Sequence, residues 1–279
     1  MIHRERLVLI GHPVSQSLSP AMHNAALEAA GMDLRYEALD VAPENLDATL
    51  AGLAKVPCGG NFTMPHKKAA MHSMRVISDV AQHVGAVNTF WGDGYGALDG
   101  DNTDVAGFDG AARDLLGEIP DGIRVAILGA GGAAAAALTA IDEWPGATAS
   151  VHARDLARAM SMRMRHSAVV RACSMRDPCL GEANLVVNAT PMGMVGDEMP
   201  IELDGLRPDA FILDLVYTPS ETALVRETRT RGHKSADGLK MLLHQGVAAF
   251  ELWFHQKPDA GVMWSALLRA TGRSEAAGQ

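Results

Sequence analysis

The sequence predicts an α/β protein of two domains, the second of which holds a doubly wound parallel sheet. The chain has 279 residues, and a domain takes about 150 residues, so two domains are expected. Short apolar segments typical of buried strands alternate with segments that carry helix-start signals, which is the pattern of α/β proteins. In the second half, one such strand runs directly into a glycine-rich turn and an alanine-rich helix.

Composition disfavours several classes of partner. Hydrophobic residues make up 48% of the chain and charged residues 20%, which is typical of a globular protein. The net charge of −9 disfavours nucleic acid or an anionic membrane surface as the main partner. No apolar run approaches the roughly 18 residues that a membrane-spanning helix needs, so we expect no membrane partner.

Cysteine usage and the N-terminus predict a cytoplasmic protein. Cys58, Cys173 and Cys179 are too few and wrongly spaced for a disulfide framework or a CxxC site. This usage fits a reducing compartment. The apolar segment Leu7–Ile10 is too short to form the core of a signal peptide.

The first hundred residues predict a small α/β domain whose sheet has an antiparallel edge. Ser19 followed by Pro20 marks a helix start, with Ser19 as the cap, and Gly31 marks the helix end. In order, the predicted elements are strand Arg6–Gly11, the helix from Ser19 to Gly31, strand Arg35–Val41, a helix from Pro43 to about Lys55, a strand at Asn61, a short helix after Ser78, strand Gly85–Trp91 and a hairpin into Gly96–Asp99.

The segment from Asn61 to Lys67 is the strongest candidate for a functional site in this domain. Asn61 and Thr63 alternate as in a strand, so both point to one face. Pro65 ends the strand and can open a helix. Lys67 would then lie at the carboxyl end of a parallel strand, where open α/β sheets bind ligands, with a proton that it can give up. The alternative is a solvated lysine on a first helical turn.

The stretch Gly100–Asp104 is predicted to open a helix that runs to about Leu116. A joint at residues 117–122 follows it and leads to the second predicted domain. Asp101 or Thr103 could cap this helix, and negative charge in its first turn suits the helix dipole. Capping is therefore one explanation for Asp104.

The second domain is predicted to alternate strands and helices, and to be followed by two helices. Its predicted strands are Arg124–Leu128, Ala147–His152, Ala168–Ala172, Leu185–Thr190 and Phe211–Tyr217, and the predicted helices are the alanine-rich one to about Ile141, Asp155–His166, Ser220–Arg231, Gly238–Phe254 and Asp259–Thr271.

The turn after Arg124–Leu128 carries the G-x-G-x-x-A form of a dinucleotide-binding fingerprint. Gly129 permits the tight turn, Gly131 lets the backbone approach a pyrophosphate, and Ala134 allows close contact between helix and strand. The amino end of the helix then faces the phosphates. A tight strand-to-helix turn without a ligand is the alternative.

The end of the following strand should decide between NAD and NADP. Arg154 and Arg158 are four residues apart, so they can lie on one helical face and clamp a 2′-phosphate. Asp155 between them is ambiguous, because it could cap the helix or bind the free 2′-hydroxyl of NAD. Two solvated arginines are the third possibility. The eleven histidines show no metal-binding spacing, so no metal site is predicted.

Taken together, these stretches resemble the shikimate dehydrogenase family, in family order over nearly the whole chain. The matching motifs are Gly11-x-Pro13, Ser17 to Asn24, Asn61 to Lys67, Gly85 to Thr89, Asn102 to Asp104, Gly129 to Ala133, Asn188 to Thr190, Asp214 to Tyr217 with Pro219, and Asp237-Gly238-Leu239 with Met241, Leu242 and Gln245. As a set they are far more specific than any one motif.

The resemblance implies a role for each matching residue. Lys67 and Asp104 correspond to the paired catalytic residues of the family. The substrate-binding residues implied are Ser17 and Ser19 for the carboxylate, Tyr217 near it, and Thr63, Asn88, Asn102 and Gln245 for the ring hydroxyls. The cofactor-binding residues implied are Gly129, Ala130, Gly131, Gly132, Ala133, Thr190, Gly238 and Met241, beside Arg154, Asp155 and Arg158.

The resemblance also implies a reaction and a domain division. The reaction would be the reversible reduction of 3-dehydroshikimate to shikimate with NADP, or with NAD, in aromatic amino acid biosynthesis. Residues 1–104 and 239–279 would form the substrate-binding domain, and residues 105–238 the NAD(P)-binding Rossmann-like domain. The protein would be a monomer or a homodimer.

Two alternatives remain open from the sequence. One is a paralogue that oxidises quinate or an amino analogue of shikimate with NAD. The other is a non-catalytic member that keeps the fold. Gln16, Phe62 and Lys240 depart from the usual family pattern. Phe62 should point away from Asn61 and Thr63 into the core, whereas Gln16 and Lys240 bear on substrate preference.

Overall fold

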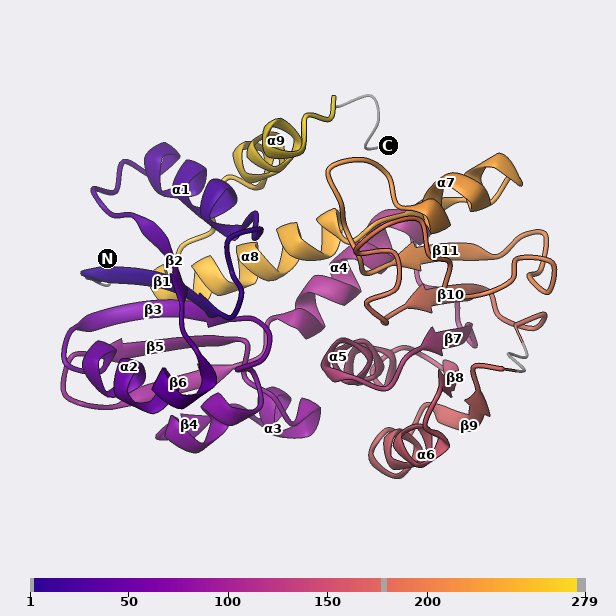
Figure 1. Cartoon of the computed structure of the whole chain (residues 1–279), viewed down its shortest axis with the longest axis horizontal. Coiled ribbons are helices and arrows are strands. Elements are labelled where there is room, and N and C mark those ends of the chain that lie inside the picture. Colours follow the sequence, from indigo (N-terminus) through magenta and orange to yellow (C-terminus); the bar gives the residue numbers. More distant parts are fainter. Residues whose placement is uncertain (1–2, 177–179, 275–279) are drawn as a thin grey trace. The chain divides into compact units, whose positions relative to one another are not determined.

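The computed structural model describes residues 3–176 and 180–274, and it confirms the predicted α/β class. The described chain divides into two compact units (Figure 1). The first holds the residues up to Thr103 together with those from Leu242 onward, and the second is Asp104–Met241. Each unit is built around its own six-stranded sheet.

The first sheet is mixed, with strand order β2-β1-β3-β5-β6-β4. Its strands are β1 (Arg6–Gly11), β2 (Tyr36–Asp40), β3 (Pro57–Phe62), β4 (Val76–Ile77), β5 (Thr89–Asp93) and β6 (Leu98–Asp101). Strand β5 runs antiparallel to both β3 and β6, whereas β4 pairs in parallel with β6. The antiparallel strand β5 was expected at an edge of the sheet and lies inside it, because it pairs with both β3 and β6.

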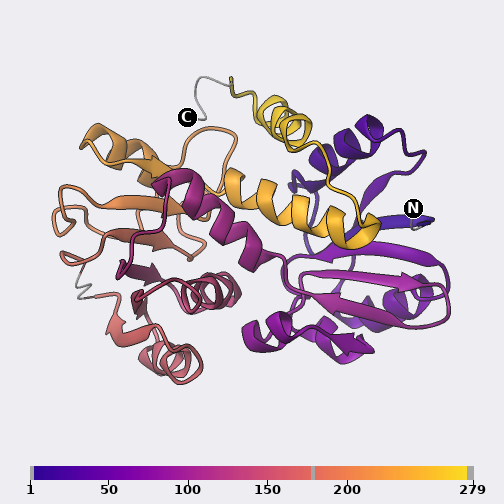
Figure 2. The ribbon, with the colours of Figure 1, turned by 180° about the vertical axis from the view of Figure 1, so that it is seen from behind.

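The helices of the first unit follow its strands closely. They are α1 (Ser19–Ala29), η1 (Pro43–Asn45), α2 (Leu46–Leu53), η2 (Ala69–Ser73), α3 (Asp79–Val84), α9 (Ala260–Thr271) and the part of α8 (Leu239–Phe254) from Leu242 onward. Helix α9 lies beside α1, although α1 ends at Ala29 and α9 begins only at Ala260, as both views of the ribbon show (Figures 1 and 2). The C-terminal helices thus complete the core that the N-terminal strands begin.

The second sheet is fully parallel, with strand order β12-β11-β10-β7-β8-β9, which confirms the doubly wound prediction. Its strands are β7 (Arg124–Leu128), β8 (Thr148–Ala153), β9 (Val169–Ser174), β10 (Leu185–Asn188), β11 (Phe211–Asp214) and β12 (Ser235–Ala236), and its helices are α4 (Asp104–Leu116), α5 (Gly132–Ile141), α6 (Leu156–Arg165) and α7 (Ala223–Thr230).

Strands β10 and β11 end two and three residues earlier than predicted. The side chain of Asn188 accepts a hydrogen bond from the Thr190 backbone N–H at 3.0 Å, and Asp214 accepts one from the Val216 N–H at 3.1 Å. Such side-chain bonds to the backbone two residues on turn the chain out of the sheet.

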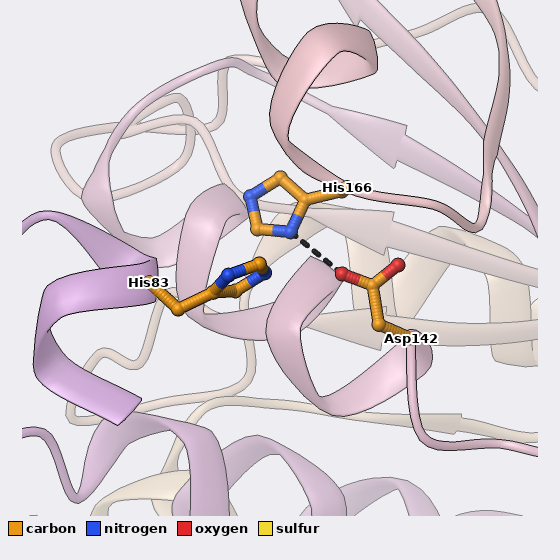
Figure 3. Close-up of side chains that lie close together, drawn as sticks. All are labelled: His83, Asp142 and His166. Carbon is orange, nitrogen blue, oxygen red and sulfur yellow. Dashed lines mark hydrogen bonds and ion pairs between the residues drawn. The ribbon is translucent and has the colours of Figure 1, made fainter. Parts of the chain in front are cut away.

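The turn between α6 and β9 is tied to the end of α5. His166 Nδ1 lies 2.9 Å from Asp142 Oδ2 (Figure 3), and the other carboxylate oxygen accepts hydrogen bonds from Ser167 and from the Ala168 N–H. Burial by itself would raise the pKa of Asp142, but these hydrogen bonds outweigh it and lower the pKa. The ionised carboxylate therefore suits this turn.

Two of the cysteines lie in the described residues and are buried. Burial raises the pKa of the Cys58 thiol to about 11, which makes it unreactive at neutral pH. Cys173 is also buried, and Cys179 lies outside the described residues. Within residues 3–176 and 180–274, every helix is too short or too polar to cross a membrane.

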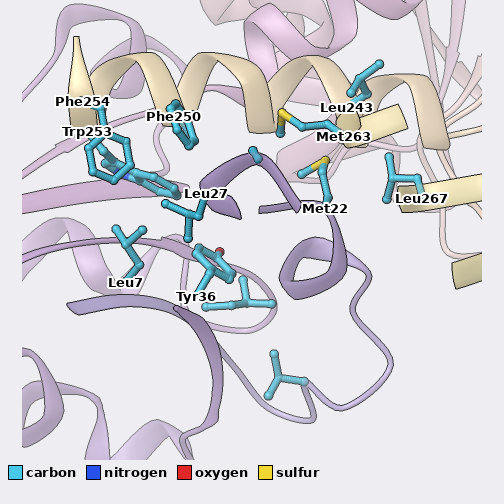
Figure 4. Close-up of a cluster of buried hydrophobic side chains, with 14 residues drawn as sticks. Leu7, Met22, Leu27, Tyr36, Leu243, Phe250, Trp253, Phe254, Met263 and Leu267 are labelled. Atoms are coloured by element: carbon cyan, nitrogen blue, oxygen red, sulfur yellow. The ribbon is translucent and has the colours of Figure 1, made fainter. Parts of the chain in front are cut away.

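The core of the first unit lies on both faces of its sheet. Leu7 and Leu9 of β1 point to the face covered by α1, α8 and α9 (Figure 4), whereas Val8 and Ile10 point to the opposite core. This is the alternation expected of a strand buried on both faces. On the helix-covered face, Trp253 is fully buried and donates a hydrogen bond from its indole N–H to the Phe90 carbonyl at 3.1 Å.

His23 lies in this core in an unusual setting. Its ring stacks on Tyr36 at a centroid distance of 4.5 Å and lies 5.0 Å from the ring of Trp253. It is fully buried, and neither ring nitrogen has a hydrogen-bond partner among the residues that the structure describes. Burial lowers the pKa of His23 to about 3, so the imidazole is neutral.

The buried, neutral imidazole of His23 predicts that the folded protein loses stability in acid. The unfolded chain binds a proton at His23 below pH ~6.5, whereas the folded chain resists protonation down to about 3, so stability falls as the pH drops through that window. Replacing His23 with Phe keeps the ring stack and removes this loss. Between pH 7 and 4.5, His23→Phe should lose about 2–3 kcal/mol less unfolding free energy than the wild type.

Urea unfolding at several pH values measures this difference. The exposed His72 provides the control, since His72→Phe should follow the wild-type pH dependence. Equal pH dependence of His23→Phe and wild type would show that His23 does not carry the effect.

Candidate active site

The residues predicted for the site are distributed over both units. The first unit carries Ser17, Ser19, Thr63, Lys67, Asn88, Asn102 and Gln245, and the second carries Asp104, Gly129, Ala130, Gly131, Gly132, Ala133, Arg154, Asp155, Arg158, Thr190, Tyr217, Gly238 and Met241. Apart from Tyr217 and Asp104, the residues predicted for substrate and catalysis thus share one unit, and those for the cofactor share the other.

The turn that carries Lys67 is anchored to its neighbours. Strand β3 ends at Phe62 rather than continuing through Pro65. The Thr63 N–H donates to the Ile10 carbonyl at 2.9 Å, and the buried His66 ring binds the Val41 carbonyl at 2.7 Å. Pro65 opens no helix, contrary to expectation, because these bonds to the ends of β1 and β2 hold residues 64–68 in turns.

Lys67 itself is positioned by its backbone. Its carbonyl accepts a hydrogen bond from the Val87 N–H at 2.8 Å, which places it beside the loop that leads into β5. Its side chain is half-buried. A lysine on a fixed backbone retains the flexible stem that a proton donor needs to follow its substrate.

A buried polar network lies behind this turn. The Tyr36 hydroxyl donates to Asn61 Oδ1 at 2.8 Å, and Asn61 Nδ2 donates to the Asn88 carbonyl at 3.2 Å. Asn88 Oδ1 in turn accepts from the Thr103 N–H at 2.7 Å and from its hydroxyl at 3.1 Å. Burial raises the pKa of Tyr36 well above its usual value, so it stays a hydrogen-bond donor. Asn61 uses both ends of its amide within the protein and serves as framework.

Ser17 and Ser19 are brought together, but not in the predicted manner. The N-cap of α1 is Leu18, whose side chain cannot accept a hydrogen bond, so Ser19 does not cap the helix. Instead, Ser17 Oγ accepts from the Ser19 N–H and donates to Ser19 Oγ, both at 3.3 Å. A carboxylate at the amino end of this helix could replace Ser19 Oγ as the acceptor of the Ser17 O–H and also accept from the Ser19 hydroxyl.

Gly11 gives Thr63 its space. A Cβ atom added to Gly11 would lie 2.3 Å from the Cγ2 methyl of Thr63. No real contact between carbon atoms is that short, so any larger residue at position 11 would displace Thr63. The need for glycine here follows from the close approach of β1 and β3 at their carboxyl ends.

Asn102 and Gln245 are both buried. Asn102 Nδ2 donates to the Ala86 carbonyl at 2.8 Å, and its backbone N–H donates to Asp101 Oδ1 at 2.7 Å. Asp101 also accepts a short hydrogen bond from Ser78, the cap of α3. Gln245 lies on α8 and donates to the Leu242 carbonyl at 2.8 Å.

In the second unit, the glycine turn has the features of a phosphate cradle. Gly129 has φ +109°, and a Cβ there would lie 2.9 Å from the Ala189 carbonyl oxygen, so only glycine fits. Gly131 is the N-cap of α5 and has no side chain to bind the first backbone N–H groups. A Cβ on Gly131 would meet no atom of the described residues within 4 Å. These N–H groups are therefore accessible to a pyrophosphate, which fits a dinucleotide cofactor.

Asp155 is in contact with the backbone of its own helix. Asp155 is the N-cap of α6 and accepts from the Ala157 N–H at 3.0 Å, while its second oxygen lies 3.7 Å from Arg158 Nε. Arg154 and Arg158 are exposed at the carboxyl end of β8. In this structure Asp155 thus acts as a helix cap and lies near Arg158.

Two of the family departures have a structural explanation. Phe62 is buried and stacks on Phe90 at 4.7 Å, as expected for a core residue. Lys240 Nζ lies 3.3 Å from Asp114 Oδ2 of α4. Gln16 is exposed in the loop before α1.

Several residues that organise the site were assigned no role from the sequence. Tyr36 and Gly11 act through distant partners that no local pattern reveals. Asn188 and Asp214 hold the loops after β10 and β11. The sequence signal that could have found them is a polar residue within each of two predicted, otherwise apolar strands.

Comparison with known proteins agrees with the family resemblance of the sequence motifs. Residues 9–90 match the family model of the shikimate dehydrogenase substrate binding domain, and residues 238–268 match that of the shikimate 5'-dehydrogenase C-terminal domain. The chain is 40% identical over 270 residues to a protein named shikimate dehydrogenase (NADP(+)) from Mesorhizobium japonicum, covering 95% of this chain and 96% of that one.

Two solved structures superpose on nearly the whole of this chain. Shikimate 5-dehydrogenase from Thermus thermophilus, in complex with NADP(H) and shikimate, superposes with a TM-score of 0.87 at 37% identity, covering 95% of this chain and 99% of that one. Quinate dehydrogenase from Corynebacterium glutamicum, in complex with NAD, superposes with a TM-score of 0.84 at 31% identity, covering 95% and 99%.

The contact between Gly11 and Thr63 predicts a specific pair of mutational effects. Gly11→Ala should lower the free energy of unfolding by about 1–3 kcal/mol, because the new methyl group overpacks against Thr63 Cγ2. Adding Thr63→Ser removes that methyl and should restore most of the loss. Urea unfolding of the single and double variants measures the coupling.

Gly52→Ala is the matched control, because a Cβ there meets no described atom within 4 Å. It lies in α2 and should be neutral or slightly stabilising. If the double variant is no more stable than Gly11→Ala, the clash is not with Thr63.

Proposed function

Because the chain belongs to the shikimate dehydrogenase family, we propose that it catalyses the reversible, NADP-dependent reduction of 3-dehydroshikimate to shikimate. One structural observation carries the proposal best. The paired hydroxyls of Ser17 and Ser19 and the turn with Lys67 follow the carboxyl ends of β1 and β3, which are neighbours in one sheet. A carboxylate-binding pair and a proton donor on adjacent strand ends suit a ring that carries both a carboxylate and a ketone.

In the proposed reaction, Lys67 handles the proton. When bound, NADPH supplies the hydride for the ring ketone. Lys67 donates a proton to the oxygen that gains negative charge, and it takes the proton back in the reverse direction. Asp104 orients Lys67 and the reacting hydroxyl. The serines hold the carboxylate, Tyr217 lies near it, and the remaining ring hydroxyls are bound by Thr63, Asn88, Asn102 and Gln245.

The cofactor is proposed to bind along the carboxyl edge of the second sheet. Residues 129–133 would hold its pyrophosphate, Arg154 and Arg158 its 2′-phosphate, and Thr190, Gly238 and Met241 its nicotinamide end. Accordingly, residues 105–238 form the cofactor-binding domain of the proposal, and residues 1–104 and 239–279 the substrate-binding domain. The proposed role belongs to aromatic amino acid biosynthesis in the cytoplasm, by a monomer or a homodimer.

The second candidate is oxidation of quinate, which the similarity to a quinate dehydrogenase structure raises. Quinate carries an additional hydroxyl beside its carboxylate, so the pocket around Ser17 and Ser19 would have to admit it. The presence of both serines favours shikimate, and capping by Asp155 favours NADP over NAD. Cofactor absorbance with shikimate and with quinate, each with NADP and with NAD, distinguishes the candidates. No turnover with either substrate would leave a non-catalytic family member.

Lys67→Ala tests the proton transfer. Loss of a positioned acid–base group typically lowers the rate by about 100- to 10,000-fold, so kcat should fall by that factor while the KM for shikimate changes only a few fold. The adjacent exposed Lys68 is the matched control, and Lys68→Ala should keep the wild-type kcat. More than about a tenth of the wild-type rate in Lys67→Ala would contradict the role.

Arg154→Ala tests the cofactor preference. The wild type should prefer NADP, and loss of hydrogen bonds to a charged phosphate costs about 1.5–3 kcal/mol each, which lowers kcat/KM for NADP by about 10- to 100-fold. The efficiency with NAD should stay nearly unchanged. Arg163→Ala, on the same helix, is the control. A wild-type preference for NAD would show that the arginines are surface charge only.

A further inference from the structure

Asp214 is a buried carboxylate that joins three segments of the second unit. It lies at the carboxyl end of β11 and has no exposed surface. It accepts hydrogen bonds from Asn188 Nδ2 at 2.8 Å, from the Thr222 hydroxyl at 2.7 Å and from the Val216 N–H at 3.1 Å. These groups belong to the end of β10, the start of α7 and the turn after β11.

All three of these partners are donors. The ionised carboxylate offers acceptor lone pairs to all three, whereas protonation turns one of these lone-pair sites into an O–H donor. Thr222 uses its proton on Asp214 and accepts the α7 capping bond from the Val225 N–H, so its hydroxyl would have to turn to accept from a protonated Asp214. Protonation of Asp214 therefore requires the hydrogen bonds of this cluster to rearrange.

The cluster reaches the residues proposed to bind the nicotinamide end of the cofactor. Asn188, held by Asp214, accepts from the Thr190 N–H at 3.0 Å and from the Thr190 hydroxyl at 2.7 Å. On the other side, the Val216 carbonyl accepts from the Gly238 N–H at 3.0 Å. A Cβ on Gly238 would lie 2.3 Å from the Leu215 carbonyl oxygen, so these two segments are in close contact.

We propose that ionised Asp214 is a positioning residue, which holds the Thr190 loop and the Val216–Gly238 contact in the arrangement that binds NADP. The inference rests on the proposed function, because it takes these segments as the nicotinamide end of the cofactor site. Asp214 acts through Asn188 and the backbone and does not itself touch the cofactor.

The ionisation of Asp214 falls in an accessible pH range. Burial raises the pKa of Asp214 most, the hydrogen bonds from Thr222, Val216 and Asn188 lower it, the nearby charge of Asp237 raises it slightly, and the resulting pKa is about 6. At pH 7.5 the carboxylate is therefore ionised, and at pH 5 it is largely protonated. Cofactor binding should weaken between these values.

The test measures the Kd for NADP by titration calorimetry from pH 5 to 8. Asp214→Asn is isosteric, places an amide N–H₂ among the three donors and does not titrate. At pH 7.5 its Kd should be at least about tenfold higher than that of the wild type. As the pH falls to 5, the ratio of the two Kd values should approach one, and the ratio also removes the titration of the cofactor's own phosphate.

A merely structural role gives a different result. A Kd ratio below about threefold at pH 7.5, or an increase that is the same at every pH, overturns the proposal. Asp209→Asn is the control, since Asp209 is an exposed aspartate of the same unit that pairs with Arg207. It should bind NADP as the wild type does at every pH.

A second pair of variants leaves Asp214 in place, so that the proposal is tested even if Asp214→Asn does not fold. Thr222→Val removes one hydrogen bond to the carboxylate, so the weakening of binding should begin at a higher pH than in the wild type. Thr222→Ser keeps the hydroxyl and should restore the wild-type profile. Identical profiles for Val and Ser at position 222 overturn the proposal.

Failure of the inference is distinguishable from failure of the proposed function. NADP binding with the expected pH response but no oxidation of shikimate supports the role of Asp214 and contradicts the substrate. Oxidation of shikimate with wild-type pH response in Asp214→Asn contradicts only the role of Asp214. Lack of NADP binding by the wild type overturns both.

Discussion

In each sheet, a side-chain amide at the carboxyl end of a central strand binds the backbone of the loop beside it. The loops of the candidate substrate site and of the candidate cofactor site are held by these bonds. In the first sheet, Asn61 at the end of β3 donates to the Asn88 carbonyl. In the second, Asn188 at the end of β10 binds Thr190 and donates to the Met192 carbonyl. Where a parallel sheet ends, the chain loses the neighbouring strand as a hydrogen-bond partner, and an amide can replace both a donor and an acceptor.

The rigidity of these loops comes from burial as well as from hydrogen bonds. The amides of Asn61 and Asn188 are almost fully buried, and a buried amide that loses a partner costs about 1–3 kcal/mol. Alternative loop arrangements are therefore disfavoured before any ligand binds. Glycine at positions 11 and 238 allows the close approach that such short connections require. A preorganised site of this kind suits a proposed reaction in which hydride and proton must arrive at defined atoms.

Local signals in the sequence determined most of the elements and the chemistry of the motifs. Ser78, Asp155 and Asp259 cap the helices predicted to start after them. The glycine turn after β7 also follows from the sequence, because positive φ and missing side chains are properties of single residues. Family membership likewise followed from motifs that can be read without a structure.

Only the tertiary structure decided how distant segments complete each other. Strands β4 and β12 are two residues long and carry no periodic pattern, so they exist only through pairing with β6 and β11. Residues 64–68 form turns rather than a helix, because Thr63 and His66 bind carbonyls of distant segments, those of Ile10 and Val41. The donors around Asp214 likewise come from three separate segments. Local propensity fixes what a residue can bind, and packing between distant segments selects which partner it has.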